Sequence, residues 1–340
     1  MTGLVGPWDQ ILEATRFYPS PHNSQPIRVR VVSEKTAQVF YDLDRGLPAE
    51  SFGIPFGHVC AGVFLESLAV VAAAAGWEVS EELSLTEMDF DAMDRLHPLG
   101  TVVLSPRAAS SDDAARRRAL DARRTNRRPY DNRAVPSADV EAVERLAAEA
   151  GHTFAMSTDA KVVADIIRVN QETLFDDLRN DAVHDEIMTW LRFSDAQARS
   201  TGDGLSADAM LMPGRLLRFA MGHRGLWEAP IIGRLIKAVY LRTMRGVAQV
   251  AWFEGPFAEP RHYVEAGRLF MRSWLELTAR GVSLHPLGTV ITNPRSHALF
   301  VEVAGIEETD GRMAWMLFRL GYATEPPVAY RRPLDEMIVA

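Results

Sequence analysis

The sequence predicts an α+β fold, an α/β sandwich made of two tandem half-domains. The chain has 340 residues, of which 47% are hydrophobic, and this is enough for two domains or one double-sized domain. Residues 58–75 and 263–280 each read as a long apolar helix that ends at a glycine. Strands precede and follow the apolar helix in both parts of the chain. We therefore place the two half-domains at residues 1–109 and 110–340.

The first half contains a hairpin before its apolar helix. Ile27–Val32 alternates apolar and basic side chains, which is typical of a half-buried strand, and Ala37–Asp42 follows as its partner. The helix over His58–Ala75 is apolar nearly all round, which indicates burial on several sides. The other expected elements of this half are a helix over Asp9–Arg16, a polar loop over residues 19–26 and a strand over Thr101–Ser105.

The second half begins with an Arg-rich helix over Asp112–Arg124. Ser137 is a suitable N-cap for a helix that ends at Ala150. Residues 194–260 are rich in Gly, Met and Arg and show no clear period, so we interpret them as an irregular insertion that acts as a lid. The remaining expected elements are helical structure over residues 159–192, a helix over Tyr263–Arg280, and strands over Ala298–Val303 and Trp315–Arg319.

The hexapeptide HPLGTV occurs twice, at His97 and at His285. The first copy lies far downstream of the glycine that ends its helix, whereas the second follows its glycine almost at once. The two copies therefore do not occupy equivalent places. The repeated order of strands and apolar helix is the better indication of duplication.

Charge and cysteine content exclude several classes of function. Lys and Arg number 37 and Asp and Glu 45, which gives a net charge of −8 and disfavours general binding to nucleic acid or to an anionic membrane. The single cysteine, Cys60, forms no intrachain disulfide and no multi-cysteine metal site, and the nine histidines lack metal-ligand spacing. The N-terminus shows no signal-peptide pattern, and the longest apolar stretch, near Leu65–Ala75, looks too short to span a bilayer. We expect a cytoplasmic protein without metal or membrane partner.

The loop PSPHNSQP, from Pro19 to Pro26, concentrates amide and hydroxyl side chains between prolines that fix the backbone. A flat heterocycle with an edge of donors and acceptors, such as an isoalloxazine, requires a rigid display of this kind. The alternative is an ordinary turn that caps a strand.

The segment RRTNRRP, from Arg123 to Pro129, holds four arginines. Arg matches phosphate with two parallel hydrogen bonds, so the segment favours a specific polyanion site. One alternative is a solvated charge run at a helix C-terminus, and another is a nucleic-acid patch, although no aromatic residues interleave. The run Tyr330-Arg331-Arg332-Pro333 is a second candidate phosphate clamp.

Taken together, these motifs resemble the nitroreductase family of flavoproteins, and above all its tandem members, the Acg-like FMN-binding oxidoreductases of actinobacteria. The first segment resembles the PS-x-x-N-x-QP loop of the family, although Ile27 replaces its usual Trp. The second resembles its R-R-S/T-x-R motif. His285 to Gly288 resembles the loop near flavin N5, and the region from Arg319 to Leu334 resembles the closing strand and phosphate-binding tail.

The resemblance implies a nitroreductase-like fold and one FMN per chain. Ordinary members are homodimers, in which each site takes the loop from one subunit and the Arg motif and tail from the other. Here the first half carries only the loop and the second half only the Arg motif and tail, which implies a monomer that imitates a dimer. The residues implied to bind the cofactor are Pro19, Ser20, Pro21, Asn23, Gln25, Arg123, Arg124, Thr125, Arg127, Pro286, Leu287, Gly288, Arg331 and Arg332.

The implied roles divide among these segments. Arg123, Arg127 and Arg331 would hold the phosphate or the pyrimidine edge, Thr125 the phosphate or ribityl chain, and Leu287 or Gly288 would offer a backbone N–H near N5. Ser20, Asn23 and Gln25 would contact the ring or sugar. The flavin carries the chemistry, so no catalytic side chain and no metal are expected.

The leading hypothesis is an FMN-dependent oxidoreductase that passes electrons from NAD(P)H to a small organic acceptor, such as a nitroaromatic compound or a quinone, or that dehydrogenates a metabolite. The alternative is a protein that binds and sequesters FMN with little turnover. The alternative rests on the apolar side chains within 194–260, which would lie over the flavin or else simply fill a core: Met210, Met212, Phe219, Met221 and Trp227.

Overall fold

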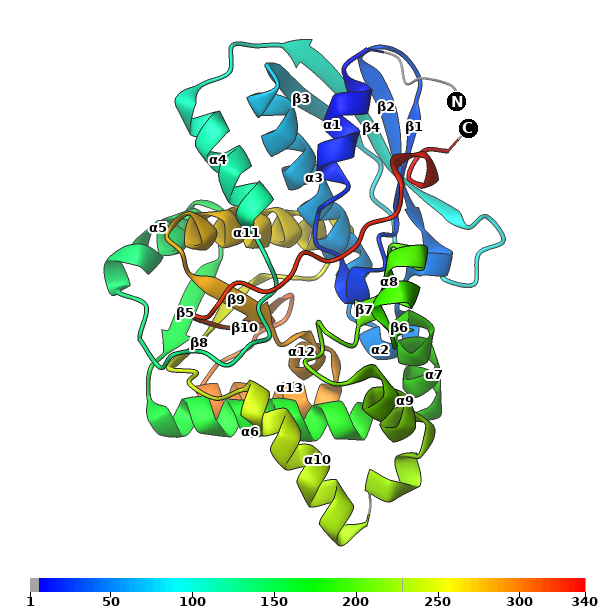
Figure 1. Cartoon of the computed structure of the whole chain (residues 1–340). Coiled ribbons are helices and arrows are strands. Elements are labelled where there is room, and N and C mark those ends of the chain that lie inside the picture. The colour runs from blue at the N-terminus through cyan, green and yellow to red at the C-terminus, as the bar shows by residue number, and fades with distance from the viewer. Residues whose placement is uncertain (1–5, 228, 340) are drawn as a thin grey trace.

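The computed structural model describes residues 6–227 and 229–339. It consists of two four-stranded antiparallel sheets with two long helices, α3 (Phe56–Ala74) and α11 (Pro260–Ala279), between them (Figure 1). The predicted α+β class is thus confirmed. Both sheets and both helices contribute to one large hydrophobic core.

The first sheet lies entirely within the first predicted half. Its strands are β1 (Ile27–Val31), β2 (Thr36–Asp42), β4 (Leu96–Pro106) and β3 (Trp77–Leu83), in that spatial order. The predicted hairpin is confirmed, because β1 pairs with β2 in a register that sets Ile27 opposite Tyr41. The alternation predicted for β1 is also seen, since Ile27 and Val29 are buried and Arg28 and Arg30 are half-buried. Helix α1 (Trp8–Thr15) covers α3 on one side.

The second sheet repeats the arrangement of the first. Its strands are β5 (Thr153–Ser157), β8 (Gln249–Pro256), β10 (Arg312–Gly321) and β9 (Ser283–Pro286), again in spatial order. In each half, two strands precede the long helix, two follow it, and the last strand of the half lies inside the sheet. The two HPLGTV copies differ as predicted, because the first lies within β4 and the second crosses from β9 into α12 (Gly288–Thr292).

The prediction of an irregular stretch over residues 194–260 is wrong in two respects. The stretch contains the helices α8 (Asp195–Thr201), α9 (Gly214–Gly222) and α10 (Pro230–Thr243). It also contains β8, an inner strand of the second sheet whose side chains are nearly all buried. An inner strand that is covered on both faces shows no alternation of apolar and polar residues, so its period gave no signal.

Two further predictions need correction. Ala298–Val303, expected as a strand, belongs to helix α13 (Pro294–Ala304), whose N-cap Asn293 accepts hydrogen bonds from the backbone N–H groups of Arg295 and Ser296. A short apolar run does not distinguish helix from strand, whereas the Asn-Pro cap before it does. Ser137, expected as an N-cap, is the first residue of α5 (Ser137–Glu149).

The other helices lie close to where the sequence placed them. The Arg-rich helix is α4 (Ser111–Ala122), and residues 159–192 form α6 (Ala160–Asp177) and α7 (Asp181–Trp190). The short elements are α2 (Pro48–Ser51), β6 (Leu191–Arg192), β7 (Leu205–Ser206) and the 3-10 turns η1 (Pro21–Asn23), η2 (Leu43–Arg45), η3 (Arg224–Trp227) and η4 (Leu334–Glu336).

Helices α3 and α11 cross at two glycines. A Cβ atom on Gly62 would lie 1.9 Å from the carbonyl oxygen of Val264, and one on Gly267 would lie 2.0 Å from the carbonyl oxygen of Val59. No side chain fits at either position, so the two backbones are in direct contact at the centre of the molecule.

Helix α3 is also long and apolar enough to cross a membrane by composition alone, contrary to the sequence prediction. However, 78% of its apolar window is buried inside the protein, and such burial is typical of a core helix.

The chain after β10 returns from the second half to the first. Residues 322–339 run in extended form across the molecule, and the chain ends beside β1 (Figure 1). The Val29 N–H donates to the Met337 carbonyl at 2.9 Å, and the Val339 N–H donates to the Val29 carbonyl at 2.9 Å. We call residues 322–339 the return segment. It ties the two halves together along one face.

Candidate functional site

A pocket of about 950 Å³ lies where the first half, the second half and the return segment meet. Both polar segments singled out in the sequence contribute to its wall. Of the residues predicted to bind a cofactor, the pocket is lined by Pro19, Ser20, Asn23, Arg123, Arg124, Thr125, Arg127 and Arg331. The wall is completed by residues of α1 and α4, by residues 195–211 and by residues 326–330. Pro21, Gln25, Pro286, Leu287, Gly288 and Arg332 are not part of it.

The loop over residues 19–26 has a strained backbone. His22, Asn23 and Gln25 have φ angles of 47°, 56° and 53°, in the left-handed region that non-glycine residues rarely adopt. The Ser20 hydroxyl accepts a hydrogen bond from the Gln25 N–H at 2.9 Å and closes the turn. The side chain of His22 pairs with the Glu50 carboxylate. The strain is therefore held in place by a dense set of local contacts.

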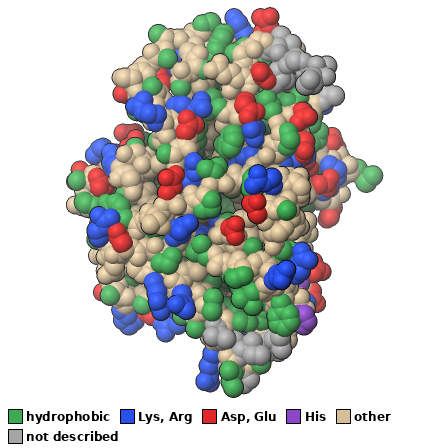
Figure 2. All heavy atoms as spheres, in the orientation of Figure 1, with side chains coloured by type: hydrophobic (Ala, Val, Ile, Leu, Met, Phe, Trp, Pro, Cys, Tyr) green, Lys and Arg blue, Asp and Glu red, His purple; other side chains and the backbone are tan. Residues whose placement is uncertain are grey.

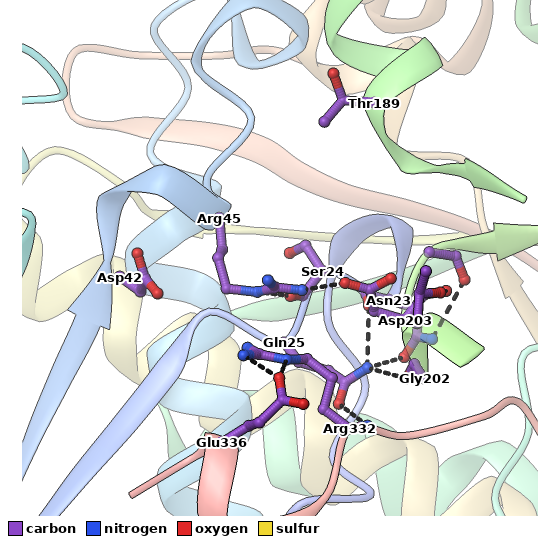
Figure 3. A network of polar contacts seen from close by, with 12 residues as sticks. Asn23, Ser24, Gln25, Asp42, Arg45, Thr189, Gly202, Asp203, Arg332 and Glu336 are labelled. Atoms are coloured by element: carbon purple, nitrogen blue, oxygen red, sulfur yellow. Dashed lines mark hydrogen bonds and ion pairs between the residues drawn. The ribbon is translucent and has the colours of Figure 1, made fainter. Parts of the chain in front are cut away.

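The amide side chains of this loop bind protein backbone. Gln25 donates to the Gly202 carbonyl at 2.9 Å and accepts from the Arg332 N–H at 3.1 Å (Figure 3). Asn23 donates to the carbonyls of Gly204 and Tyr330, at 3.2 and 3.1 Å. The loop thus clasps the turn over residues 202–204 and the return segment. Gln25 is buried behind the wall, which differs from its predicted contact with a ligand.

Asp203 anchors that turn to the first half. Its carboxylate receives Arg192 Nη2 at 2.6 Å and also pairs with Arg45, whose Nε donates to the Ser24 carbonyl at 2.5 Å (Figure 3). Burial alone would raise the pKa of Asp203, but the hydrogen bonds from Arg192 and Arg45 hold that pKa below its usual value. Sequence reasoning missed this group because Arg45 and Asp203 are far apart in the chain and belong to no motif.

The arginine segment follows α4 in extended form and is fixed to the edge of the second sheet. Thr125 bridges to Leu284 of β9, and the Asn126 N–H donates to the Leu284 carbonyl at 3.0 Å. The Asn126 side chain, which is buried, donates to the Thr324 carbonyl at 3.1 Å. The side chains on either side of the buried Asn126 therefore face the pocket from a rigid support.

Arg319 supports the same segment from within the core. It is fully buried, and it donates to the carbonyls of Asn126 at 3.4 Å and Arg128 at 3.2 Å. Its Nε donates to His285 Nδ1 at 3.1 Å, so His285 is the acceptor. Burial, and then the charges of Arg319 and Arg127, keep the pKa of His285 well below its usual value, and this histidine is neutral.

Five of the arginines that line the pocket lack anionic partners. Within the part of the chain that the structure describes, no ion pair involves Arg123, Arg124, Arg127, Arg128 or Arg331. Four of these five, Arg123, Arg124, Arg128 and Arg331, have an Nε atom that is buried without a hydrogen-bond partner in the described structure. Buried polar groups in proteins are nearly always paired, so this concentration of unpaired donors indicates that the pocket receives an anion.

Burial lowers the pKa of three of these arginines. It lowers the pKa of Arg123 to about 9, with further contributions from the charges of Arg331 and Arg124. It likewise lowers the pKa of Arg331 and of Arg127 to about 10. Arg123 keeps one favourable contact, since its guanidinium carbon lies 4.5 Å from the centre of the Trp274 ring.

The return segment supplies the last cation of the pocket. Arg331 donates to the carbonyls of Tyr330 at 3.0 Å and Phe17 at 3.3 Å, while Arg332 turns away and pairs with Glu336, with its Nε at 2.6 Å from Oε2. The Tyr330 hydroxyl donates to Asp195 of α8 at 2.7 Å. Of the two arginines predicted in this run, only Arg331 faces the pocket.

The segment predicted to lie near flavin N5 has a different place. Pro286 ends β9 and Gly288 begins α12, and neither lines the pocket. The Leu287 N–H, predicted to be available to a ligand, donates to the Leu317 carbonyl at 2.8 Å, and the Leu287 side chain is buried. This N–H is therefore already used within the second sheet.

The apolar side chains expected over the ligand form a separate core instead. Met221 and Trp227 are buried in a cluster with residues of α6 and α7, and Met210 and Met212 pack against it. Phe219 is half exposed and stacks on His223. None of these five side chains lines the pocket.

Comparison with known proteins gave matches among solved structures alone. No family model matches the sequence, and no curated protein matches it either. The solved structures include the FMN and NADPH-dependent nitroreductase NfnB from sphigopyxis sp. strain HMH, at 16% identity and a TM-score of 0.40 over 66% of this chain and 98% of that one. They also include NfnB from Mycobacterium smegmatis in complex with NADPH, at 17% identity and a TM-score of 0.37 over 66% of this chain and 96% of that one. A third is iodotyrosine deiodinase bound to FMN and 3-iodo-L-tyrosine, at 16% identity and a TM-score of 0.36 over 64% of this chain and 95% of that one.

Proposed function

We propose that this protein is an FMN-dependent oxidoreductase of the nitroreductase type, which takes electrons from NAD(P)H and passes them to a small organic acceptor. The observation that carries the proposal is the set of unpaired arginines in the pocket between the two halves. A phosphate monoester would supply the missing negative charge and the missing acceptors. The order of the sequence motifs, which resembles that of flavoproteins of this type, selects FMN among such esters.

The residues present fit this cofactor in size and in chemistry. A pocket of about 950 Å³ is at the upper end of the usual range for small-molecule sites, roughly 300–1,000 Å³. Arg123, Arg124 and Arg331 would hold the phosphate, because the charges of these three interact with one another. The Thr125 hydroxyl, on the same wall, would hydrogen-bond the phosphate or the ribityl chain.

A second positive centre lies deeper, at Arg127 and Arg319. The charge of each lowers the pKa of the neighbouring His285. Positive charge beside a bound flavin raises its affinity for electrons. The bound FMN would supply the redox chemistry, so the role of the chain is to bind it, to orient it and to limit its contact with water.

FMN titration tests the binding. We expect flavin fluorescence to be quenched and one FMN to bind per chain. Arg331→Gln should weaken binding about tenfold or more, because the variant lacks one charged phosphate partner. The matched control is Arg332→Gln, one position further on, which should bind FMN normally because Arg332 pairs with Glu336 outside the pocket. Equal affinity of both variants would contradict the proposed phosphate site.

A second candidate function is FMN sequestration with little turnover. Gln25, Asn23 and the Asp203–Arg45 pair fasten the turn over residues 202–204, which is part of the pocket wall. A wall fastened in this way would keep the pocket closed, and this favours sequestration. Anaerobic addition of NADPH to the flavin-loaded protein separates the two functions. Rapid bleaching of the flavin band supports the oxidoreductase, whereas no bleaching with NADH or NADPH supports sequestration.

We further propose that the chain arose by tandem duplication and works as a monomer with one site. The equal strand order of the two sheets and the equal position of α3 and α11 support this. Sedimentation should give the mass of a single chain, and two FMN molecules released per chain would contradict the single site. The cytoplasmic location and the half-domain boundary at residues 109 and 110 stay predictions.

A further inference from the structure

The segment over residues 214–245 has a charge opposite to that of the rest of the chain. It holds seven of the 37 Arg and Lys residues and one of the 45 Asp and Glu residues, a net charge of +6 in a chain with a net charge of −8. It forms α9, η3 and α10. Figure 1 shows η3 and α10 projecting beyond α6 at the end of the molecule opposite the first sheet. We call residues 214–245 the basic projection.

Most of the seven cations of the basic projection are exposed and without an ion pair in the described structure. Arg215, Arg234, Arg242 and Arg245 are exposed, and none of them forms an ion pair within the described residues. Arg224 differs, because its Nη2 lies 2.7 Å from Asp181 Oδ1. Four unpaired charges on one projecting segment are available to an anionic partner.

The same segment exposes large apolar side chains. Ile231, at the start of α10, is 83% exposed, and Phe219 and Leu216 of α9 are 51% and 49% exposed. Leu241, near the end of α10, is also exposed. Figure 2 shows hydrophobic and basic side chains next to one another over this end of the molecule. Large apolar side chains exposed on a projecting segment are typical of an interaction surface.

The structure points to a lipid surface as the partner. We propose that the basic projection docks onto membranes that contain anionic phospholipids, with its arginines at the phosphates and Ile231 and Phe219 in the acyl boundary. Helices with basic and large apolar side chains bind membrane interfaces in this way. Leu216, Phe219, Ile231 and Leu241 are exposed and do not line the pocket between the two halves, so these side chains are available to the acyl boundary of a lipid surface.

The local charge also explains why the sequence predicted no membrane partner. That prediction rested on the net charge of the whole chain, whereas docking depends on charge within about one Debye length of the lipid surface, roughly 10 Å. The proposal is independent of the identity of any cofactor.

Vesicle flotation with the full chain tests the proposal. Phosphatidylcholine vesicles that contain phosphatidylglycerol should bind the protein, and added salt should weaken this binding, whereas pure phosphatidylcholine vesicles should not bind it. Arg234→Glu combined with Arg242→Glu should lower partitioning about tenfold or more. The matched control is Arg145→Glu with Arg261→Glu, which makes the same change of charge at exposed arginines of α5 and α11 and should bind like the wild type.

Several outcomes would overturn the proposal. These are equal binding to both kinds of vesicle, no binding at all, or an equal loss in the two double variants. Self-association that Ile231→Asn abolishes would assign the surface to a second copy of the chain. Salt dependence of wild-type binding needs no variant, so the proposal stays testable even if a charge reversal impairs folding.

Discussion

Replacement of Arg123 by Met should have opposite effects on stability and on FMN binding. Arg123 is 5% exposed and lacks an anionic partner in the described structure, and burial lowers its pKa from the usual value of an arginine to about 9. The charged form is therefore disfavoured in the folded, FMN-free protein. Met keeps most of the side-chain volume and removes the charge, so the FMN-free variant should be more stable than the wild type.

The size of this effect follows from the pKa. One pKa unit corresponds to ~1.36 kcal/mol, so the charged form is destabilised by roughly 5 kcal/mol as an upper value. Loss of the contact with the Trp274 ring costs about 1 kcal/mol, and local rearrangement reduces the remainder. We expect a net gain of about 2 kcal/mol in the free energy of unfolding at pH 7.

The pH dependence of stability tests independently whether the buried charge of Arg123 destabilises the FMN-free protein. Between about pH 9 and 12.5 the unfolded chain holds a proton on Arg123 that the folded protein has lost, so wild-type stability rises with pH in this window. Below about pH 9 Arg123 is charged in both the folded and the unfolded protein, so the full free-energy cost of burying its charge is present. The advantage of Arg123→Met should therefore be largest near neutral pH and decrease above pH 9.

Urea unfolding of the FMN-free proteins and fluorescence titration with FMN measure the two effects. We expect FMN affinity to fall about tenfold or more, because a charged hydrogen bond is worth ~1.5–3 kcal/mol. Arg116→Met is the matched control, since Arg116 is an exposed arginine of α4 outside the pocket and should affect neither quantity. A less stable FMN-free variant, or an unchanged FMN affinity, would refute the reasoning.

Three further predictions follow from other buried positions. Asp177 is buried with one oxygen unpaired, and burial raises its pKa to about 6, so the free-energy cost of its charge in the folded protein grows from about pH 4 to pH 6. Urea unfolding should therefore show that Asp177→Asn raises the free energy of unfolding by about 2 kcal/mol at pH 7.5 and leaves it unchanged at pH 3.5. Gly62→Ala should cost about 3 kcal/mol because its Cβ would overlap a backbone carbonyl, whereas Gly222→Ala, with nothing within 4 Å of the added atom, should cost nothing in the same assay. Gln25→Met should speed proteolysis near residues 202–204, because the hydrogen bonds of Gln25 with the Gly202 carbonyl and the Arg332 N–H are lost, and an unchanged cleavage rate would show that the clasp is dispensable.

The sequence predicted elements well where one face of an element meets solvent. β1 alternates along its length and was found, whereas β8 is buried on both faces and was taken for part of an insertion. Asn293 and Pro294 mark the start of α13, but the apolar run behind them is too short to decide between helix and strand by itself. Whether such a run forms a helix or a strand depends on its tertiary packing, and the local sequence pattern carries no information on that packing.

Part of the candidate site could likewise be predicted from the sequence and part could not. The loop over residues 19–26 and the arginine segment stood out because their composition is unusual, and the structure brings both to one pocket. Arg45 and Asp203 did not stand out, since each is an ordinary charged residue until the fold places them together. The resemblance to the family's tail is weaker at Arg332 than at Arg331, and in the structure Arg331 faces the pocket whereas Arg332 does not.

The return segment sets an order of events during synthesis. Residues 326–331 leave the ribosome after every other residue of the pocket wall, at a time when both sheets are already outside. Domains fold as they emerge, from the N-terminal side. A nascent chain can thus form both sheets while the pocket still lacks Arg331 and the clasp between Asn23 and Tyr330. The proposed binding of FMN would then be the last step of maturation, after both sheets have formed.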